Sequence, residues 1–134
     1  MIIGMDLKKH PKVIRDAYND PAGITEAFNL NLLHRINKEL EADFDVTNFI
    51  HSPTYNPETG EARSYLLSTK KQSVHIGKAQ QRFEFNAWET IHTEISKKFD
   101  QEDIQCLVKK SGFILKKTYL DSNKYYTDLL LTKP

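Results

Sequence analysis

The sequence contains a single cysteine, Cys106, and only five glycines among its 134 residues. One cysteine cannot form an internal disulfide, and it cannot supply a cysteine-rich zinc site. The five glycines form neither the G-x-G-x-x-G pattern of dinucleotide-binding loops nor a P-loop, so no phosphate cradle is visible. No hydrophobic run approaches the ~20 residues that a membrane-spanning helix needs. We therefore expect no transmembrane segment and no nucleotide-binding loop in this chain.

Charge of one sign is also lacking, since 19 Lys and Arg stand against 18 Asp and Glu, a formal net charge of +1. This balance removes the usual electrostatic argument for binding nucleic acid or an anionic membrane. The first residues lack the basic region and the long apolar stretch of a secretory signal peptide. The length lies within the common size of one domain, about 100–150 residues. The sequence therefore predicts a soluble, cytoplasmic, globular chain.

The patterns of apolar and turn residues predict an α+β fold with antiparallel strands and three helices. In the longest helix, the apolar residues fall at helical spacing and predict one continuous buried stripe. Its members are Ile24, Phe28, Leu32, Leu33, Ile36 and Leu40. Asp100 is expected to cap the third helix, which ends at Ser111-Gly112. The expected helices are 11–19, a longer one that opens at 23–25 and exits at 43–45, and 101–111. The expected strands are 2–5, 62–69, 72–76, 81–85, 90–96, 113–120 and 125–132.

Patterns for common catalytic and metal sites are absent. The five histidines do not show the H-E-x-x-H spacing of a zinc site, and no serine stands in a G-x-S-x-G elbow. Cys106 falls inside an amphipathic helix, as a small core or boundary residue would. We therefore assign no metal site and no catalytic nucleophile.

The segment Glu89–Ser96 carries a dense set of polar side chains in an expected strand. Residues two apart in a strand share a face, which predicts that Thr90, His92, Glu94 and Ser96 project together, opposite Ile91, Thr93 and Ile95. A carboxylate and a hydroxyl on one face can accept from and donate to a small polar ring such as an imidazole. The alternative is a hydrophilic outer face of the sheet, which the pattern alone favours.

A second dense segment is Tyr18–Gly23, where a phenol and two Asx side chains precede the longest helix. Its position beside a helix N-terminus suits the carboxylate of a ligand. Ordinary capping of the helix is the alternative, and the pattern alone again favours it.

Several segments together resemble a known family. They run in the order Gly4–Lys9, Ala17–Asn29, Leu32–Phe44, Tyr55–Pro57 and Glu89–Phe99. In this order they are similar to the carboxyl-terminal half of the histidine-specific, S-adenosylmethionine-dependent N-methyltransferases. The best-known members of that family make the betaine hercynine on the route to ergothioneine. The resemblance covers essentially the whole chain.

The resemblance implies a division of the chain between two parts of a larger enzyme. Residues 11–99 would form the α+β substrate-binding domain. Residues 1–10 and 100–134 would belong to a class I methyltransferase sheet, with the last helix and β-hairpin finishing it. The family's cofactor, S-adenosylmethionine, binds to an amino-terminal half that these residues do not include. The resemblance therefore implies no cofactor-binding residue in this chain and no activity for the chain alone.

The resemblance also implies a set of substrate-binding residues. Tyr18 matches the family tyrosine that contacts the carboxylate of the amino acid. Glu94 and Ser96 match the pair that holds the imidazole ring of histidine. Ser64 stands where the family often has a methionine that lines the imidazole pocket, so the wall of that pocket departs from the family pattern. No catalytic residue is assigned.

Two partners follow from the same interpretation: an amino acid such as histidine, and either the missing amino-terminal half or a second copy of the chain. The alternative function is a non-catalytic domain that binds a small ligand or a protein, as a strand-exchanged dimer for example. Neither nucleic acid nor membrane is expected as a partner.

Overall fold

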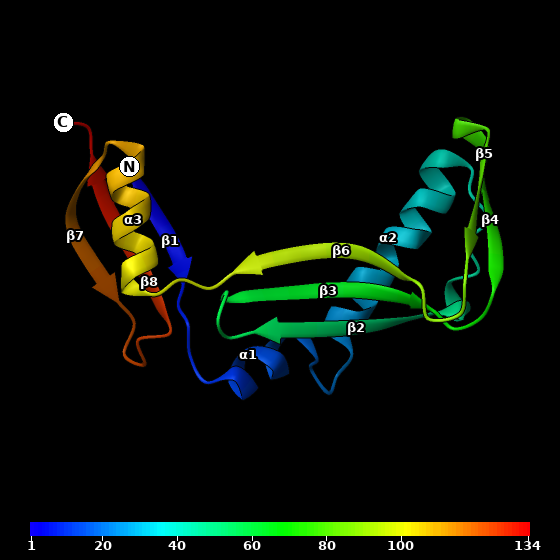
Figure 1. Ribbon diagram of the computed structural model, residues 1–134, viewed down its shortest axis with the longest axis horizontal. Helices are drawn as coiled ribbons and strands as arrows, with labels where there is room; N and C mark the ends of the chain where they lie inside the picture. The colour runs from blue at the N-terminus through cyan, green and yellow to red at the C-terminus, as the bar shows by residue number, and fades with distance from the viewer. The chain divides into compact units, whose positions relative to one another are not determined.

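The computed structural model describes residues 1–134 and confirms an α+β fold with antiparallel sheets (Figure 1). The helices are α1 (Pro11–Tyr18), α2 (Ile24–Leu40) and α3 (Gln101–Ser111), with single 3-10 turns η1 (Val46–Asn48) and η2 (Gly77–Ala79). The strands are β1 (Ile2–Asp6), β2 (Phe49–Asn56), β3 (Glu61–Ser68), β4 (Gln72–Ile76), β5 (Gln81–Phe85), β6 (Thr90–Lys97), β7 (Ile114–Leu120) and β8 (Tyr126–Thr132).

The chain divides into two compact units that each draw on separate stretches of sequence. Unit 1 contains residues 1–14, 55–62 and 96–134, and unit 2 contains residues 15–54 and 63–95. The strands form three sheets with the orders β1-β8-β7, β2-β3-β6 and β4-β5. None of the helices is long and apolar enough to cross a membrane.

Unit 1 is built on the sheet β1-β8-β7, with α3 packed against one face (Figure 1). Alternate residues of β8 point toward α3, and Leu129 and Leu131 join Met5 and Ile104 in its core. Asp100 begins α3 through a capping box with Asp103, as the sequence predicts. The strand β1 lies at the edge of the sheet and pairs with β8 alone, and its last residue is Asp6.

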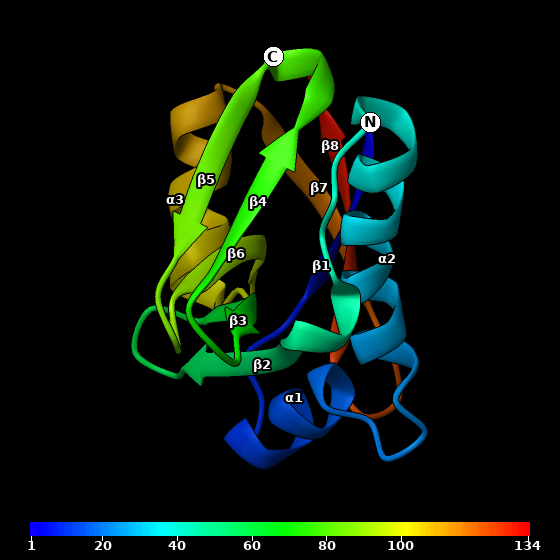
Figure 2. The same cartoon turned by 90° about the vertical axis from the view of Figure 1, so that its right-hand side faces the viewer.

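In unit 2, α2 packs over the sheet β2-β3-β6, in which β3 is the central strand (Figure 1). Every second residue of β3 is buried, because those side chains face α2 while the others face away. The core contains Leu33 from α2, Leu66 from β3 and Val74 from β4. Phe44 and Phe49 close it with ring centroids 5.7 Å apart in an edge-to-face arrangement. The hairpin of β4 and β5 contributes to the same core, and Figure 2 shows it as a twisted two-stranded ribbon.

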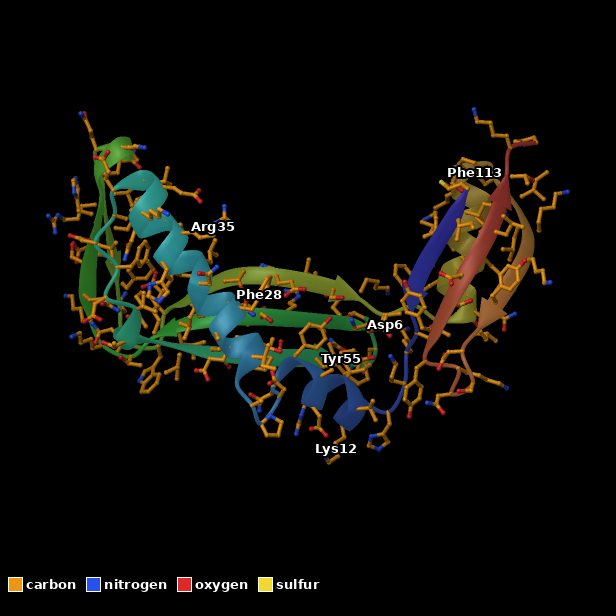
Figure 3. All side chains as sticks on the ribbon, turned by 180° about the vertical axis from the view of Figure 1, so that it is seen from behind. Asp6, Lys12, Phe28, Arg35, Tyr55 and Phe113 are labelled. Atoms are coloured by element: carbon orange, nitrogen blue, oxygen red, sulfur yellow. The ribbon has the colours of Figure 1, made fainter.

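The helix α2 buries only part of the stripe that the sequence predicts, in which Leu33 and Ile36 pack into the core of unit 2. Leu33 is fully buried, but Ile24 and Phe28 are 71% and 72% exposed. The polar Asn29 lies on the buried face instead, with only 3% of its surface accessible. The expected stripe of six apolar residues is therefore wrong at both ends, because Leu40 at the carboxyl-terminal end is also exposed. Figure 3 shows Phe28 and Arg35 on this helix.

Candidate functional site

A β-bulge in β6 decides which polar side chains of this strand face α2. Trp88 donates its backbone N–H to the carbonyl of Ser68, and Ser68 donates to the carbonyl of Glu89. At the other end, Lys98 donates its N–H to the carbonyl of Gly60. Glu89 and Lys98 are nine positions apart in the sequence, whereas their hydrogen-bonding partners Ser68 and Gly60 are only eight positions apart. The β6 side therefore carries one residue more than its partner, which breaks the alternation of its side chains.

The prediction that His92 and Glu94 share one face of β6 is wrong for this reason. The ring of His92 lies against Tyr65, with centroids 5.1 Å apart, and Tyr65 belongs to the residues of β3 that face away from α2. Glu94 instead lines a cleft beside α2 together with its neighbour Thr93. Ile95, which strict alternation would place with Thr93, is 51% exposed.

The cleft beside α2 has a volume of about 350 Å³ and combines apolar walls with two opposite charges. Phe28 and Leu32 of α2 supply the apolar surface, Arg35 supplies a cation and Glu94 a carboxylate. Arg35 is held by an ion pair with Glu39, one turn further along the helix, at 3.1 Å. The remaining lining residues are Asn29, Asn31 and Thr93. A small polar molecule with an apolar ring is the size and chemistry that such a cleft can hold.

Hydrogen bonds tie the floor of this cleft to α2. The Thr93 hydroxyl lies 2.6 Å from Oδ1 of Asn29 and 3.1 Å from the backbone oxygen of Ser64. Asn29 donates from Nδ2 to the carbonyl of Thr25 at 3.1 Å. The buried amide therefore joins helix and strand at the position next to Glu94. Helical spacing does not reveal the role of Asn29, because it predicts buried positions from apolar residues alone.

Ser64 lies on the buried face of β3, the one that points toward α2, and its side chain is fully buried. Its hydroxyl oxygen is one of three buried side-chain atoms without a hydrogen-bond partner, along with atoms of His51 and Thr132. A buried polar atom without a partner carries a desolvation cost, which a ligand or a water can remove. Ser64 therefore has an unmet hydrogen-bonding demand beside the cluster of Asn29 and Thr93.

Tyr18, the predicted carboxylate contact, is the last residue of α1 and is half-buried. It does not line the cleft beside α2. The neighbouring Asp20 accepts hydrogen bonds from the backbone N–H groups of Ile24 and Thr25, both at 2.9 Å. The bonds from Thr25 and then Ile24 lower the pKa of Asp20 to about 2. The corner before α2 is thus capped by Asp20, as the alternative interpretation of this segment states.

A second cleft, of about 380 Å³, lies beside α1 and β2. It is lined by Arg15, Asp16, Asn19, His51, Ser52 and Pro53. Burial lowers the pKa of His51, and the negative charges of Glu26, Asp20 and Glu94 only partly oppose that shift. His51 is therefore a neutral ring near neutral pH, with a buried Nε2 that has no partner.

Ser96, the other predicted imidazole contact, belongs to unit 1 and lies in a cluster of charges. Its hydroxyl accepts a hydrogen bond from Nζ of Lys98 at 2.8 Å. The same ammonium lies 3.0 Å from Oδ2 of Asp6, whose other oxygen is bonded by Lys9. Burial opposes ionisation of Asp6, but the two lysines outweigh it and hold its pKa below the ordinary value. Figure 3 labels Asp6 at the end of β1 and Tyr55 at the end of β2.

Comparison with known proteins identifies the class of this chain as S-adenosylmethionine-dependent methyltransferases. Residues 1–133 match the family of histidine-specific methyltransferases within that class, and the chain belongs to this family. Two curated relatives are histidine N-alpha-methyltransferases. The protein from Mycobacterium tuberculosis is 36% identical over 112 residues, and the one from Mycolicibacterium smegmatis is 34% identical over 112 residues. The ergothioneine biosynthesis protein 1 of Schizosaccharomyces pombe is 28% identical over 134 residues.

The chain matches only part of each relative. The alignments cover 84% of this chain but 35% of either mycobacterial protein, and 99% of this chain but 17% of the Schizosaccharomyces pombe protein. The match of residues 1–133 to the family model confirms, at the level of the family, the resemblance inferred from the sequence.

The glycines of this chain are not arranged as the glycine-rich loop that would hold the family's cofactor. A side chain at Gly60 would overlap the carbonyl of Lys98, and one at Gly4 would overlap the ring of Tyr126. Gly23 and Gly112 have positive φ values and flank α2 and α3. These glycines serve the packing and turns of the chain itself, so they do not form a glycine-rich cofactor loop.

Proposed function

We propose that this chain is the substrate-binding part of an S-adenosylmethionine-dependent N-methyltransferase that acts on histidine. The observation that carries the proposal is Glu94, a carboxylate that lines a small cleft with mixed apolar and polar walls in a chain of this family. An ionised carboxylate accepts hydrogen bonds only, and an imidazole N–H supplies the matching donor. In this proposal Glu94 orients the ring, while the remainder of a longer enzyme binds the cofactor.

The other substrate contacts are proposed residue by residue from the family pattern. Tyr18 would donate its phenol to the carboxylate of the amino acid, and Ser96 would contact the second nitrogen of the imidazole. Ser64 would border the ring pocket, since its buried hydroxyl has no partner in the chain. Unit 2 would contribute most of the substrate domain, and the sheet β1-β8-β7 would complete the methyltransferase sheet.

For methyl transfer itself, these residues need only hold the substrate in position. The α-amine must be neutral to attack the sulfonium methyl group in line, and its proton must pass to an acceptor. Residues that hold the ring and the carboxylate at fixed points restrict where the amine can lie. The proposed role of this chain is therefore to bind and orient the amino acid.

The proposal is tested by titration calorimetry with the full chain and two ligands, L-histidine and histamine, which lacks the carboxylate. Glu94→Gln should weaken the binding of both ligands about tenfold or more, because a hydrogen bond to a charged group contributes about 1.5–3 kcal/mol. Tyr18→Phe should weaken the binding of histidine and leave histamine unchanged. Glu84→Gln is the matched control, an exposed carboxylate on β5 in the same unit.

Two results would contradict the proposal. The first is a wild-type chain that is folded by its amide NMR spectrum and binds neither ligand at millimolar concentration. The second is equal histidine affinity for wild type, Glu94→Gln and Glu84→Gln, which would remove Glu94 from the site.

A further inference from the structure

His92 is an exposed histidine of β6 for which the proposed substrate contacts leave no role. Its ring stacks on the ring of Tyr65, with centroids 5.1 Å apart and 34° between the planes. Its Nε2 lies 2.9 Å from the backbone oxygen of Glu94. A carbonyl oxygen can only accept a hydrogen bond, so Nε2 carries the proton and donates it. The ring therefore connects β3 to the backbone of the residue that lines the cleft beside α2.

The β-bulge lies at the two residues that follow His92. Thr93 bonds to Asn29 of α2, and Glu94 lines the cleft beside the same helix, so two successive side chains lie on one side of β6. The Thr93 hydroxyl also lies 3.1 Å from the backbone oxygen of Ser64, which places that residue of β3 opposite the pair. Two residues opposite one define a bulge. Glu94 reaches the cleft because the extra residue is at this point of the strand.

Few backbone contacts can hold the bulge in place. A bulge interrupts the hydrogen-bond ladder, and β6 is an edge strand with β3 as its one neighbour in the sheet. A weakly specified strand can slip by one residue, which turns its side chains to the other face. Side chains must therefore help to fix the bulge. Thr93 does so on the face toward α2, and His92 does so from the opposite face by bonding to the Glu94 carbonyl.

We infer that His92 is a positioning residue that holds the bulge of β6 and thereby keeps the Glu94 carboxylate in the cleft beside α2. The inference rests on the proposed function, in which this carboxylate orients the imidazole of the substrate. His92 acts from the far face of the sheet and through the backbone of Glu94. Tyr65, the support of its ring, belongs to unit 2 together with the bulge and the cleft.

The size of the effect follows from the conformational freedom of the Glu94 side chain. The carbonyl oxygen turns with the backbone dihedral ψ, and the backbone dihedrals decide which side-chain rotamers are allowed. Without the bond from His92, the side chain can spread over three staggered χ1 rotamers, one of which suits the ligand. The affinity then falls with the competent fraction, about threefold. The loss expected for Glu94→Gln, about tenfold or more, is the upper bound.

The test is titration calorimetry of the full chain with L-histidine. In His92→Gln the amide nitrogen is separated from Cβ by as many bonds as Nε2 of histidine, so this variant should keep the bond and bind as tightly as wild type. His92→Asn has a side chain one bond shorter, and His92→Phe keeps an aromatic ring on Tyr65 without a donor. Both of these variants should bind about threefold more weakly.

Two further measurements distinguish positioning from a general loss of stability. In a Glu94→Ala background, His92→Asn should not change the affinity further, because the group that it positions is absent. Three-bond NMR couplings of Glu94 should report one χ1 rotamer in wild type and His92→Gln, and an average over rotamers in His92→Asn. His75→Asn is the matched control, because His75 lies in β4 of the same unit and its ring makes no hydrogen bond.

The outcomes separate this inference from the proposed function. A wild type that does not bind histidine refutes the proposed function, and the couplings of Glu94 then decide the inference, which unchanged couplings in His92→Asn would refute. A wild type that binds histidine no more tightly than His92→Asn refutes the inference alone. Equal losses for His92→Gln and His92→Asn refute it as well, because the donor at the Nε2 position would then have no effect. The same holds for equal losses in His75→Asn and His92→Asn.

Discussion

The hydrogen bonds of Asn29 predict a measurable coupling between α2 and β6 beside the proposed substrate cleft. Asn29→Ala removes two bonds, one donated to the carbonyl of Thr25 and one accepted from the hydroxyl of Thr93. At about 0.5–1.5 kcal/mol for each bond, the free energy of unfolding should fall by about 1–3 kcal/mol. Thr93→Val leaves Oδ1 of Asn29 buried without its partner, for a loss of about 1–3 kcal/mol.

The double variant should lose less than the two single losses together, because the bond between the two side chains is removed only once. We expect a coupling energy of about 1 kcal/mol, within the range found for residues in direct contact. Thr93→Ser retains the hydroxyl and should retain the coupling. Asn31→Ala is the matched control, since it makes the same substitution at an exposed position two residues along the same helix.

The assay is urea unfolding followed by the amide NMR signals of α2 and β6, which report on unit 2 directly. A coupling energy below about 0.3 kcal/mol would be within the additivity of independent sites and would refute the reasoning. Equal losses for Asn29→Ala and Asn31→Ala would refute it as well, because the buried amide would then contribute no more than an exposed one.

Three further predictions concern stability. Leu33→Ala should lower the free energy of unfolding by about 2–5 kcal/mol in urea titrations, since Leu33 is fully buried in the core of unit 2. Gly60→Ala should destabilise unit 1 by more than the ~1–2 kcal/mol that a non-glycine residue costs in the left-handed conformation, because its added Cβ would also overlap the carbonyl of Lys98. Amide exchange near Lys98 that is no faster than in wild type would contradict this prediction. Asp20 and Asp100 both have pKa values lowered to about 2 from an ordinary 3.8, so their contribution to stability is present above pH 4 and is lost as the pH falls toward 2. Replacing both with Asn should flatten the decline of the urea midpoint over that range, and an unchanged slope would exclude them as its source.

Local signals in the sequence are sufficient to predict most of the secondary structure. Asp100 and Gly112 define α3 because capping and a positive φ value are decided within a few residues. The strands β4 and β5 follow from alternating apolar residues in the same way. These features depend on neighbours in the chain, which the sequence displays directly.

The candidate site depends on contacts between distant segments, and the sequence predicts it less well. Helical spacing alone cannot say that Asn29 is buried while Phe28 is exposed, because the partner surface decides which face of α2 is covered. Nor does the sequence show the pairing of Lys98 with Asp6, which lie 92 positions apart. The sequence identifies Glu94 as a polar strand residue, but its position beside α2 depends on a bulge that periodicity does not reveal.

The extra residue in β6 also determines which mutations can change the side of the strand that meets α2. Substitution changes the chemistry at position 94 but leaves its side of the sheet unchanged. Deleting one residue between Glu89 and Lys98 would equalise the two strands and turn the intervening side chains to the opposite face. Relatives that differ in length here would present different side chains to the cleft even where their residues are identical. For this strand, a change in length would therefore alter which side chains face α2, whereas a substitution alters only the chemistry at one position.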